Sequence, residues 1–321
     1  MREYIIRRLL LVIPGVIVLT IFVFGLVRLV PGDAIDVIVQ ITTGYRSGGL
    51  SQEKRDELKA ALGLDKPIYV QYFVWMSDVV RGDLGKGLHN KLPVLDTIKA
   101  RFAVTLELVV FTMFLMVIWG LSIGIFSALH QDTWMDYLFR SVAIAGLSIP
   151  YFWTAVLLLL FGSLWFNWSP PFGMNNFIDD PWTNIQQFFA PSIILAIALG
   201  SALARMTRAT IIEVMRQDYI RTARAKGLVD RTVLSRHALK NAMIPVVGLI
   251  GVEFAFALGG TVILERIWTL PGMGQLMLTA IERRNYPMIQ GIILILGSLV
   301  MIVNLLVDLS YAWLNPRIRY Q

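Results

Sequence analysis

Few side chains in this sequence have the types and spacing that catalysis requires. Ser235 and His237 combine a hydroxyl with an imidazole, the two groups of a nucleophile and its base. They are two residues apart, so on a helix their side chains point in different directions. His89 and His130 have no partner at metal-ligand spacing, and the chain has no cysteine. We therefore predict no catalytic residue, no metal site and no enzymatic activity.

One short segment suggests a phosphate-binding loop. The stretch "GDLGKG" at 82–87 places a lysine between glycines, as nucleotide-binding loops do. It lacks the G-x-x-x-x-G-K-[ST] spacing, and no other stretch of the chain has it. We therefore predict that the chain itself binds no nucleotide and no other cofactor.

Glu253 is the remaining residue whose side chain could have a chemical role. It lies near the middle of the apolar run "GLIGVEFAFALGG" at 248–260. Ionisable residues inside a membrane usually face the interior of a helix bundle or a water-filled cavity. We therefore consider Glu253 a candidate for a translocation path or a subunit interface, with a structural, hydrogen-bonded role as the alternative.

These residues must be positioned by membrane-spanning helices. Hydrophobic residues make up 56% of the chain and charged residues 16%, against about 25% charged in a soluble domain. Spanning a bilayer takes about 20 apolar residues. Segments of suitable character lie at 9–30, 102–129, 137–168, 190–205, 243–264 and 288–313. We predict an all-α protein with six spans, a kink at Pro150 in the third, and continuation of the short fourth beyond Leu203.

The N-terminal segment has the charge pattern of a signal sequence, with Arg2, Arg7 and Arg8 in front of an apolar run. The run from Leu9 to Val27 is longer than a typical signal core, and no small-residue cleavage site follows it. We interpret it as a retained anchor helix; a removed signal peptide is the alternative.

The distribution of basic residues predicts the orientation. The loop at 169–189 has no lysine or arginine, whereas the segment at 205–241 has nine. Cytoplasmic loops carry the excess of basic residues, so we place this segment and both termini in the cytoplasm. The same rule accounts for the net charge of +7 without a nucleic-acid partner.

The long segment at 31–101 would then lie outside. Ser51 is suited to begin a helix that Gly63 ends. After the break at Pro67, the stretch "GLDKPIYVQYFVWM" at 63–76 is aromatic-rich and amphipathic. We expect it to lie on or near the membrane surface and not to cross the membrane.

We call residues 205–242 the basic loop. We predict that a helix continues from Arg205 to Arg221 and ends at Gly227, a residue free to adopt the left-handed conformation. Asp230 is suited to cap a second helix that stops near Pro245. The expected structure is two helices joined by a tight turn next to the membrane.

Three interpretations of the basic loop remain open: a solvated positive loop, a patch for lipid headgroups, and a docking element for a cytoplasmic protein. Ala223 and Ala225 lie just before the turn, and their small side chains permit close approach of another surface. The ordered turn and the alanine pair favour docking.

The sequence also resembles a known family along nearly its whole length. "ARAKGL" and "HALKNAMIPVV" in the basic loop resemble the EAA-type loop of ABC importer permeases of the dipeptide/oligopeptide family. The first position of this motif is Thr222 or Ala223 where the family form has Glu. Further similar segments are "VRLVPGD" (27–33), "LGLDKPIYVQY" (62–72), "RGDLG" (81–85), "TLEL" (105–108), "SIPYF" (148–152), "LPGMGQLMLTAIERRNYPMIQG" (270–291) and "NLLVDLSYAWLNPRIR" (304–319).

The resemblance implies a type I ABC importer permease fold in a prokaryotic cell membrane, and a peptide as substrate. Its partners would be two ATPase subunits, a second homologous permease, an extracytoplasmic substrate-binding protein and membrane lipid. The basic loop would contact an ATPase subunit. The residues that the resemblance assigns to this contact are Arg221, Ala223, Ala225, Lys226, Gly227, Leu228, His237, Asn241 and Pro245.

The implied domain organisation has three parts. Residues 1–101 would hold the first span and the outer segment, 102–313 a five-helix transmembrane domain, and 314–321 a cytoplasmic tail.

Two other functions are alternatives to the importer permease. A self-contained, ion-coupled secondary transporter needs mid-membrane carboxylates and usually an internal repeat, and only Glu253 fits. A membrane-embedded enzyme needs polar side chains clustered at one depth, and the sequence shows no such cluster.

Overall fold

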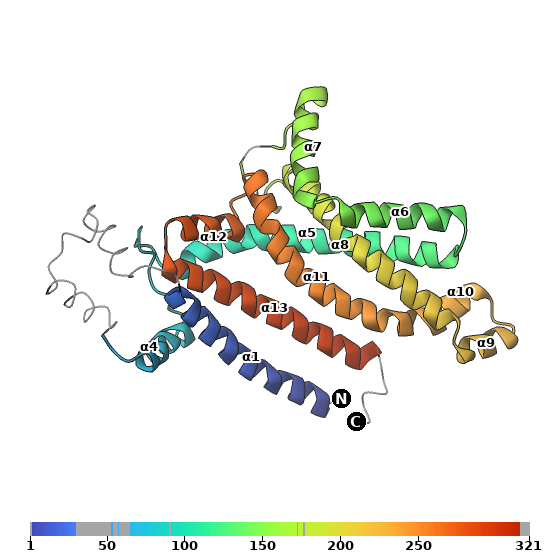
Figure 1. The fold of residues 1–321 in the computed structure, drawn as a ribbon, viewed down its shortest axis with the longest axis horizontal. Helices are drawn as coiled ribbons and strands as arrows, with labels where there is room; N and C mark the ends of the chain where they lie inside the picture. Colours follow the sequence, from blue (N-terminus) through green and yellow to red (C-terminus); the bar gives the residue numbers. More distant parts are fainter. Residues whose placement is uncertain are drawn as a thin grey trace. The chain divides into compact units, whose positions relative to one another are not determined.

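The computed structural model describes residues 2–29, 53, 57, 65–89, 91–171, 173–175 and 177–314. Over these residues the chain is helical, and the strand-like pairing is limited to an isolated bridge between Lys86 and Pro93 (Figure 1). The predicted all-α class is therefore confirmed. Apart from positions 53 and 57, the helix expected between Ser51 and Gly63 lies outside the described residues, and so does the tail at 314–321 apart from Leu314.

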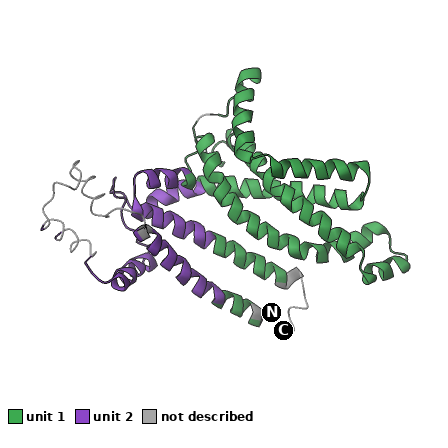
Figure 2. Cartoon of the chain, in the orientation of Figure 1, with its two compact units in different colours: residues 1–10, 104–274, 300–321 green, residues 11–103, 275–299 purple. Residues whose placement is uncertain are grey.

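The chain divides into two compact units (Figure 2). One comprises residues 1–10, 104–274 and 300–321, and the other residues 11–103 and 275–299. The helices in chain order are α1 (Arg2–Leu29), α4 (Ile68–Val80), α5 (Val94–Leu129), α6 (Trp134–Ser148), α7 (Tyr151–Phe166), α8 (Pro181–Met215), α9 (Asp218–Ala225), α10 (Asp230–Thr232), the π-helix η2 (Val233–Ala238), α11 (Leu239–Ile267), α12 (Met273–Glu282) and α13 (Tyr286–Leu314).

Within the described residues, five helical stretches are long and apolar enough to cross a membrane, and the bent pair of α6 and α7 makes a sixth if the two helices form one span. The axes of α6 and α7 differ by 93° at Ile149 and Pro150. Pro150 forces Ile149 into an extended conformation and lacks the amide proton that a continuous helix needs. The predicted kink is therefore a full break between two helices.

The short fourth segment is part of a much longer helix. As expected, α8 continues beyond Leu203, and it ends at Met215. It also begins earlier than predicted, because the Asp180 side chain accepts a hydrogen bond from the Thr183 amide at 3.2 Å and Pro181 occupies the first turn. Pro191 lies inside this helix without ending it.

The first unit is held together by close helix packing. A Cβ atom added to Gly124 of α5 would lie 2.6 Å from both the Ala204 carbonyl oxygen and the Thr207 Cβ of α8. Any larger residue at 124 would force these two helices apart, so the glycine sets their separation. Leu108, Phe188, Leu195 and Leu264 form part of a buried cluster nearer the other ends of α5, α8 and α11.

In the second unit, α4 packs on α1. The break at Pro67 is confirmed, since α4 begins at the next residue. The Tyr72 hydroxyl lies 2.9 Å from the Thr20 hydroxyl of α1. Elsewhere in this unit the Leu88 amide donates to the Asn285 side chain at 3.2 Å, which ties the segment before α5 to the start of α13.

Candidate functional site: the basic loop and the buried carboxylates

The basic loop is folded, but its first part differs from the prediction. A single helix was expected from Arg205 to Arg221, whereas α8 ends at Met215 and α9 begins at Asp218. Gln217 has an extended backbone that reverses the chain direction. The reason is tertiary: the reversal brings Ile220 back against Val214 and Met215, where its side chain is fully buried.

The turn at Gly227 is confirmed. Gly227 has φ +80°, in the left-handed region that glycine adopts without steric cost. Its amide donates to the Arg224 carbonyl at 2.9 Å, and the Leu228 amide donates to the Ala223 carbonyl at 3.4 Å. This pair of bonds is the Schellman arrangement, which satisfies the last carbonyls of α9.

Asp230 has a different role from the predicted one. Val229 occupies the cap position of α10, and no side-chain cap bond is made there. The Asp230 carboxylate instead accepts from Arg224 Nε at 3.0 Å, which ties α10 to α9 across the turn. The prediction of a cap was wrong because the arginine of the preceding helix offers a charged donor at this distance.

The second helix of the loop also fails to stop near Pro245. α10, η2 and α11 follow one another without interruption, and Pro245 lies exposed inside α11. The six residues of η2 form a π-helix, a rare form that is often found at functional sites. The loop therefore joins the α11 span directly.

A small apolar core stabilises the loop. Ile220, Ala223, Val233 and Ala238 are buried together. Ala223 is 7% exposed and faces this core, whereas Ala225 is exposed. The two alanines expected to face a partner are thus divided: Ala223 packs inside the loop, and Ala225 lies on its surface.

The other predicted site residues lie around the turn and the base of the loop. Arg221, Lys226, Leu228 and Val229 are exposed, and Val229 reaches 67%. His237 is half-buried and Asn241 is exposed. The Asn241 side chain donates to the Tyr219 hydroxyl at 2.8 Å and so fixes the start of α9 on the start of α11.

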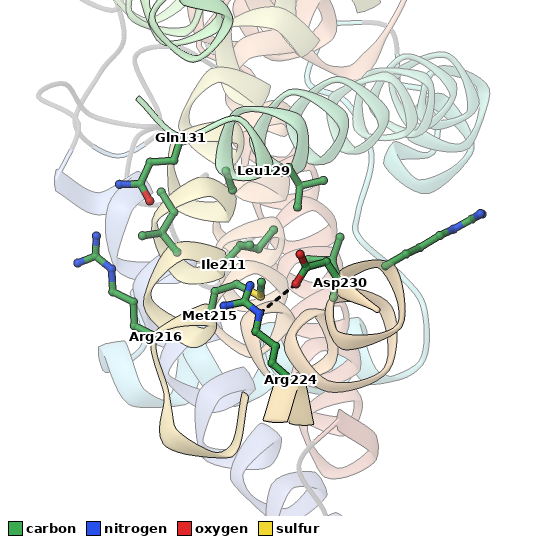
Figure 3. A pocket seen from close by; sticks show the side chains of 11 residues that line it. Leu129, Gln131, Ile211, Met215, Arg216, Arg224 and Asp230 are labelled. Atoms are coloured by element: carbon green, nitrogen blue, oxygen red, sulfur yellow. Dashed lines mark hydrogen bonds and ion pairs between the residues drawn. The ribbon is translucent and has the colours of Figure 1, made fainter. Parts of the chain in front are cut away.

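A pocket of about 600 Å³ lies beside the loop (Figure 3). Leu129 at the end of α5 and Gln131 just after it line one part of the pocket, α8 contributes Ile211 and Met215, and α9 and α10 contribute the ion pair of Arg224 and Asp230. Figure 3 shows Arg224 and Asp230 pointing toward each other, with Gln131 and Arg216 on another side of the pocket. The basic side chains do not converge, so this geometry does not identify an anion site.

Glu253 is buried in α11, with 6% of its surface exposed. None of the described residues hydrogen-bonds to its carboxylate. Two residues before it along the chain, α11 is close to α13: a Cβ at Gly251 would lie 2.9 Å from Val307 Cγ2. A buried carboxylate without a partner among the described residues is costly, which makes a partner outside this chain relevant.

Sequence reasoning missed two other buried carboxylates. Asp136 is fully buried and accepts from Arg208 Nε at 2.8 Å and Nη2 at 2.6 Å, from the Asp132 amide at 3.0 Å, and from the Ser127 hydroxyl. Arg208 was counted among the basic residues of the loop, and nothing in the local sequence indicates its partner 72 positions away. The pair joins the first turn of α6 to α8.

Glu265 is the other. It is fully buried near the end of α11 and accepts from the Thr105 hydroxyl at 2.6 Å. The same hydroxyl accepts from the Met273 amide at 2.7 Å. A side chain at Gly274 would lie 2.9 Å from the Glu265 carboxylate. The glycines of "LPGMG" are the sequence signal for this contact, because the turn after α11 must approach the Glu265 carboxylate closely.

Comparison with known proteins supplies the family. Residues 120–320 match the model described as "Binding-protein-dependent transport system inner membrane component", and residues 1–109 match the N-terminal model of these membrane components. The glutathione transport system permease protein GsiC of Escherichia coli (strain K12) is 38% identical over 322 residues, covering 100% of both chains. The dipeptide transport system permease protein DppB of Alkalihalophilus pseudofirmus is 37% identical over 340 residues, again covering 100% of both.

A solved structure agrees at the level of the fold. An inward-facing structure of the MetNI methionine ABC transporter matches with a TM-score of 0.54 and 15% identity, covering 68% of this chain and 96% of that one. These matches favour the importer permease over the ion-coupled secondary transporter. The chain therefore belongs to the family of binding-protein-dependent transport system inner membrane components and is a non-catalytic, multi-pass permease subunit of a bacterial ABC importer.

Proposed function

We propose that this permease imports short peptides and that an ATPase subunit drives it through the basic loop, at the surface formed by Arg221, Ala225, Lys226 and Leu228. The observation that carries the proposal is the structure of the loop. Its own buried core, the glycine turn and the bond between Arg224 and Asp230 hold a defined surface that a merely solvated loop does not need.

The composition of this surface supports a protein partner. Leu228 and Val229 expose apolar side chains at the turn, and Arg221 and Lys226 surround them with positive charge. An apolar centre with a charged rim is the usual arrangement of a protein interface. These residues lie at the tip of the turn, the part of the loop that is furthest along the chain from both spans.

The assembly that we propose has two ATPase subunits, a second homologous permease and an extracytoplasmic substrate-binding protein, all in contact with membrane lipid and none with nucleic acid. The basic loop and both termini lie in the cytoplasm, as the distribution of lysine and arginine indicates. We keep the division into 1–101, 102–313 and 314–321, with ATP and Mg²⁺ bound by the ATPase subunits.

The alanine pair provides a test with a matched control. The chain has no cysteine, so Ala225→Cys gives a single thiol on the exposed side of α9. We expect it to crosslink to an ATPase subunit in the intact transporter, to an extent that depends on the bound nucleotide. Ala223→Cys, two residues away and facing the loop core, should crosslink far less.

Two results would contradict the assignment of α9 to the ATPase contact. A thiol at 225 that a water-soluble maleimide modifies fully in the intact transporter, with every nucleotide state, would show that no subunit covers α9. Equal crosslinking from 223 and 225 would show that the loop does not keep the fold described above.

The substrate class rests on the relatives, one named for glutathione and one for dipeptides. Both compounds are short peptides, and the binding protein is expected to make most of the selection. Purifying the transporter gently with its binding protein and measuring uptake of dipeptides, glutathione and longer peptides into vesicles tests this directly. Uptake of none of them, by a transporter that hydrolyses ATP in response to its binding protein, would contradict a peptide substrate.

For Glu253 we propose a place on the translocation path or at the contact with the second permease. Its burial without a hydrogen-bond partner among the described residues supports both. Glu253→Gln keeps the shape and removes the charge. Reduced recovery of the second permease is expected for an interface, and normal recovery with altered uptake for a path. Unchanged recovery together with unchanged uptake would exclude both roles.

A further inference from the structure

One side of α4 is fixed on the last three turns of α1. Besides the hydroxyl pair of Tyr72 and Thr20, the ring of Phe24 lies 5.3 Å from that of Tyr72 and 5.6 Å from that of Trp75. Arg28 donates to the Gln71 side chain and stacks on Phe24. Thr20 and Phe24 are buried by this packing. The contact is therefore a specific one.

This contact lies at the depth of the hydrocarbon core. The apolar stretch of α1 that could span a membrane runs from Ile5 to Leu26. Thr20 precedes Leu26 by six residues, which at a rise of about 1.5 Å per residue is about 9 Å along the helix. Half of the hydrocarbon core is about 15 Å thick. The Tyr72 side chain therefore reaches inside the boundary of the membrane that α1 crosses.

The length of α4 excludes a crossing. Its 13 residues extend about 20 Å, and the hydrocarbon core is about 30 Å thick. Because α4 is too short to cross the membrane and contacts α1 inside the hydrocarbon core, it must lie within a single leaflet. The hydroxyl pair fits this location, because an unpaired hydroxyl in an apolar medium costs free energy.

The other side of α4 is apolar over the first two turns and is exposed. Tyr69 and Phe73 are exposed by 63% and 67%, and Val74 by 52%. A hollow of about 610 Å³ runs along this side from Tyr69 to Arg81, and Ser77 and Asp78 line it near the C-terminal end of the helix. The apolar turns gain nothing from contact with water, whereas acyl chains solvate such side chains without cost.

We propose that α4 is an interfacial helix embedded in the leaflet at the C-terminal end of α1, with Tyr69, Phe73 and Val74 against phospholipid acyl chains. The exposed Lys66 before α4 and Arg81 after it mark its ends at the headgroups, where basic side chains interact with phosphate. The aromatic residues of α4 are those that favour the membrane interface. Lipid thus holds α4, and α4 supports the end of the first span.

Site-directed spin labelling of the intact transporter in phospholipid vesicles tests this placement. A nitroxide at Phe73→Cys should collide with oxygen, which concentrates in acyl chains, several-fold more often than with water-soluble nickel ethylenediaminediacetate. A label at Lys66→Cys, on an exposed polar position just before Pro67, should show the reverse preference. The natural absence of cysteine from this chain makes both labels specific.

Two other outcomes would overturn the proposal. A label at 73 that the nickel reagent reaches as readily as the label at 66 would place this side of α4 in water. A label at 73 that neither reagent reaches, in a transporter of normal composition and uptake, would show that a protein subunit covers this side and that lipid does not.

Discussion

Replacing Arg208 with alanine is expected to destabilise this permease by about 3–5 kcal/mol, more than any other single change to an ion pair described here. Asp136 is fully buried, and two of its four hydrogen bonds come from the Arg208 guanidinium, at 2.6 and 2.8 Å. Removing the arginine leaves a buried carboxylate with only the Ser127 hydroxyl and the Asp132 amide. The penalty comes from this uncompensated charge, because burying it took a large desolvation cost.

The effect can be measured as the temperature at which this chain leaves the purified transporter. A change of 1 kcal/mol moves the midpoint of a 150–250-residue domain by about 2–4 °C, so a fall of about 10 °C is expected. Arg208→Lys should give an intermediate loss, since an ammonium cannot donate two parallel bonds to a carboxylate. Asp136→Leu combined with Arg208→Met should recover most of the stability, because the pair is then removed together.

Arg221→Ala is the matched control, compared by the thermal midpoint of the permease subunits purified without the ATPase, because Arg221 lies on the proposed ATPase surface. Arg221 also pairs with an aspartate, Asp218 at 3.4 Å, but both side chains are exposed. Exposed pairs of this kind contribute about 0–1 kcal/mol. If Arg208→Ala shifted the midpoint no more than Arg221→Ala does, the pair of Asp136 and Arg208 would not stabilise the fold. The attachment of α6 to α8 would then have to come from the close packing of Gly146 on Ser201.

Features with a local cause were predictable from the sequence. The apolar runs place the candidate spans, Pro150 marks the break between α6 and α7, and Pro67 marks the start of α4. The left-handed turn at Gly227 follows from the conformational freedom of glycine within a helical pattern. In each case the determining residue lies at the break or turn that it shapes.

Features with a distant cause were not predictable. Ile220 ends a predicted helix early because its side chain packs against Val214, Met215 and Val233, and only the folded loop brings these together. Asp136 and Arg208 are 72 positions apart, and Glu265 and Thr105 are 160 apart. Without homologous sequences, pairing across such separations has no signature in the composition or periodicity of either segment. Asp230 shows the same limit at short range, since its partner is Arg224 and the helix end that it was expected to cap is left without a side-chain bond.

Gly227→Val is expected to separate ATP hydrolysis from transport. A Cβ at this position would meet nothing within 4 Å, so the substitution acts through the backbone alone. A residue with a Cβ costs about 1–2 kcal/mol in the left-handed conformation, and a β-branched residue is the least suited to it. That strain changes the population of the folded turn by about 5–30-fold. The spans and their buried contacts are unaffected, so the chain should still be recovered with its partners.

Uptake of substrate per ATP hydrolysed is the measurement that tests this, because a variant that merely folds poorly loses uptake and hydrolysis together. Gly227→Asn is the control: asparagine tolerates the left-handed conformation, so the turn and the coupling should be largely retained. If the valine and asparagine variants transport equally well, the left-handed turn is not needed for coupling, and the contact with the ATPase must depend on the exposed side chains of α9 and not on how the turn presents them. If both fail equally while binding of the ATPase persists, the requirement is for a bare backbone at 227, which would indicate that the partner surface approaches the glycine itself.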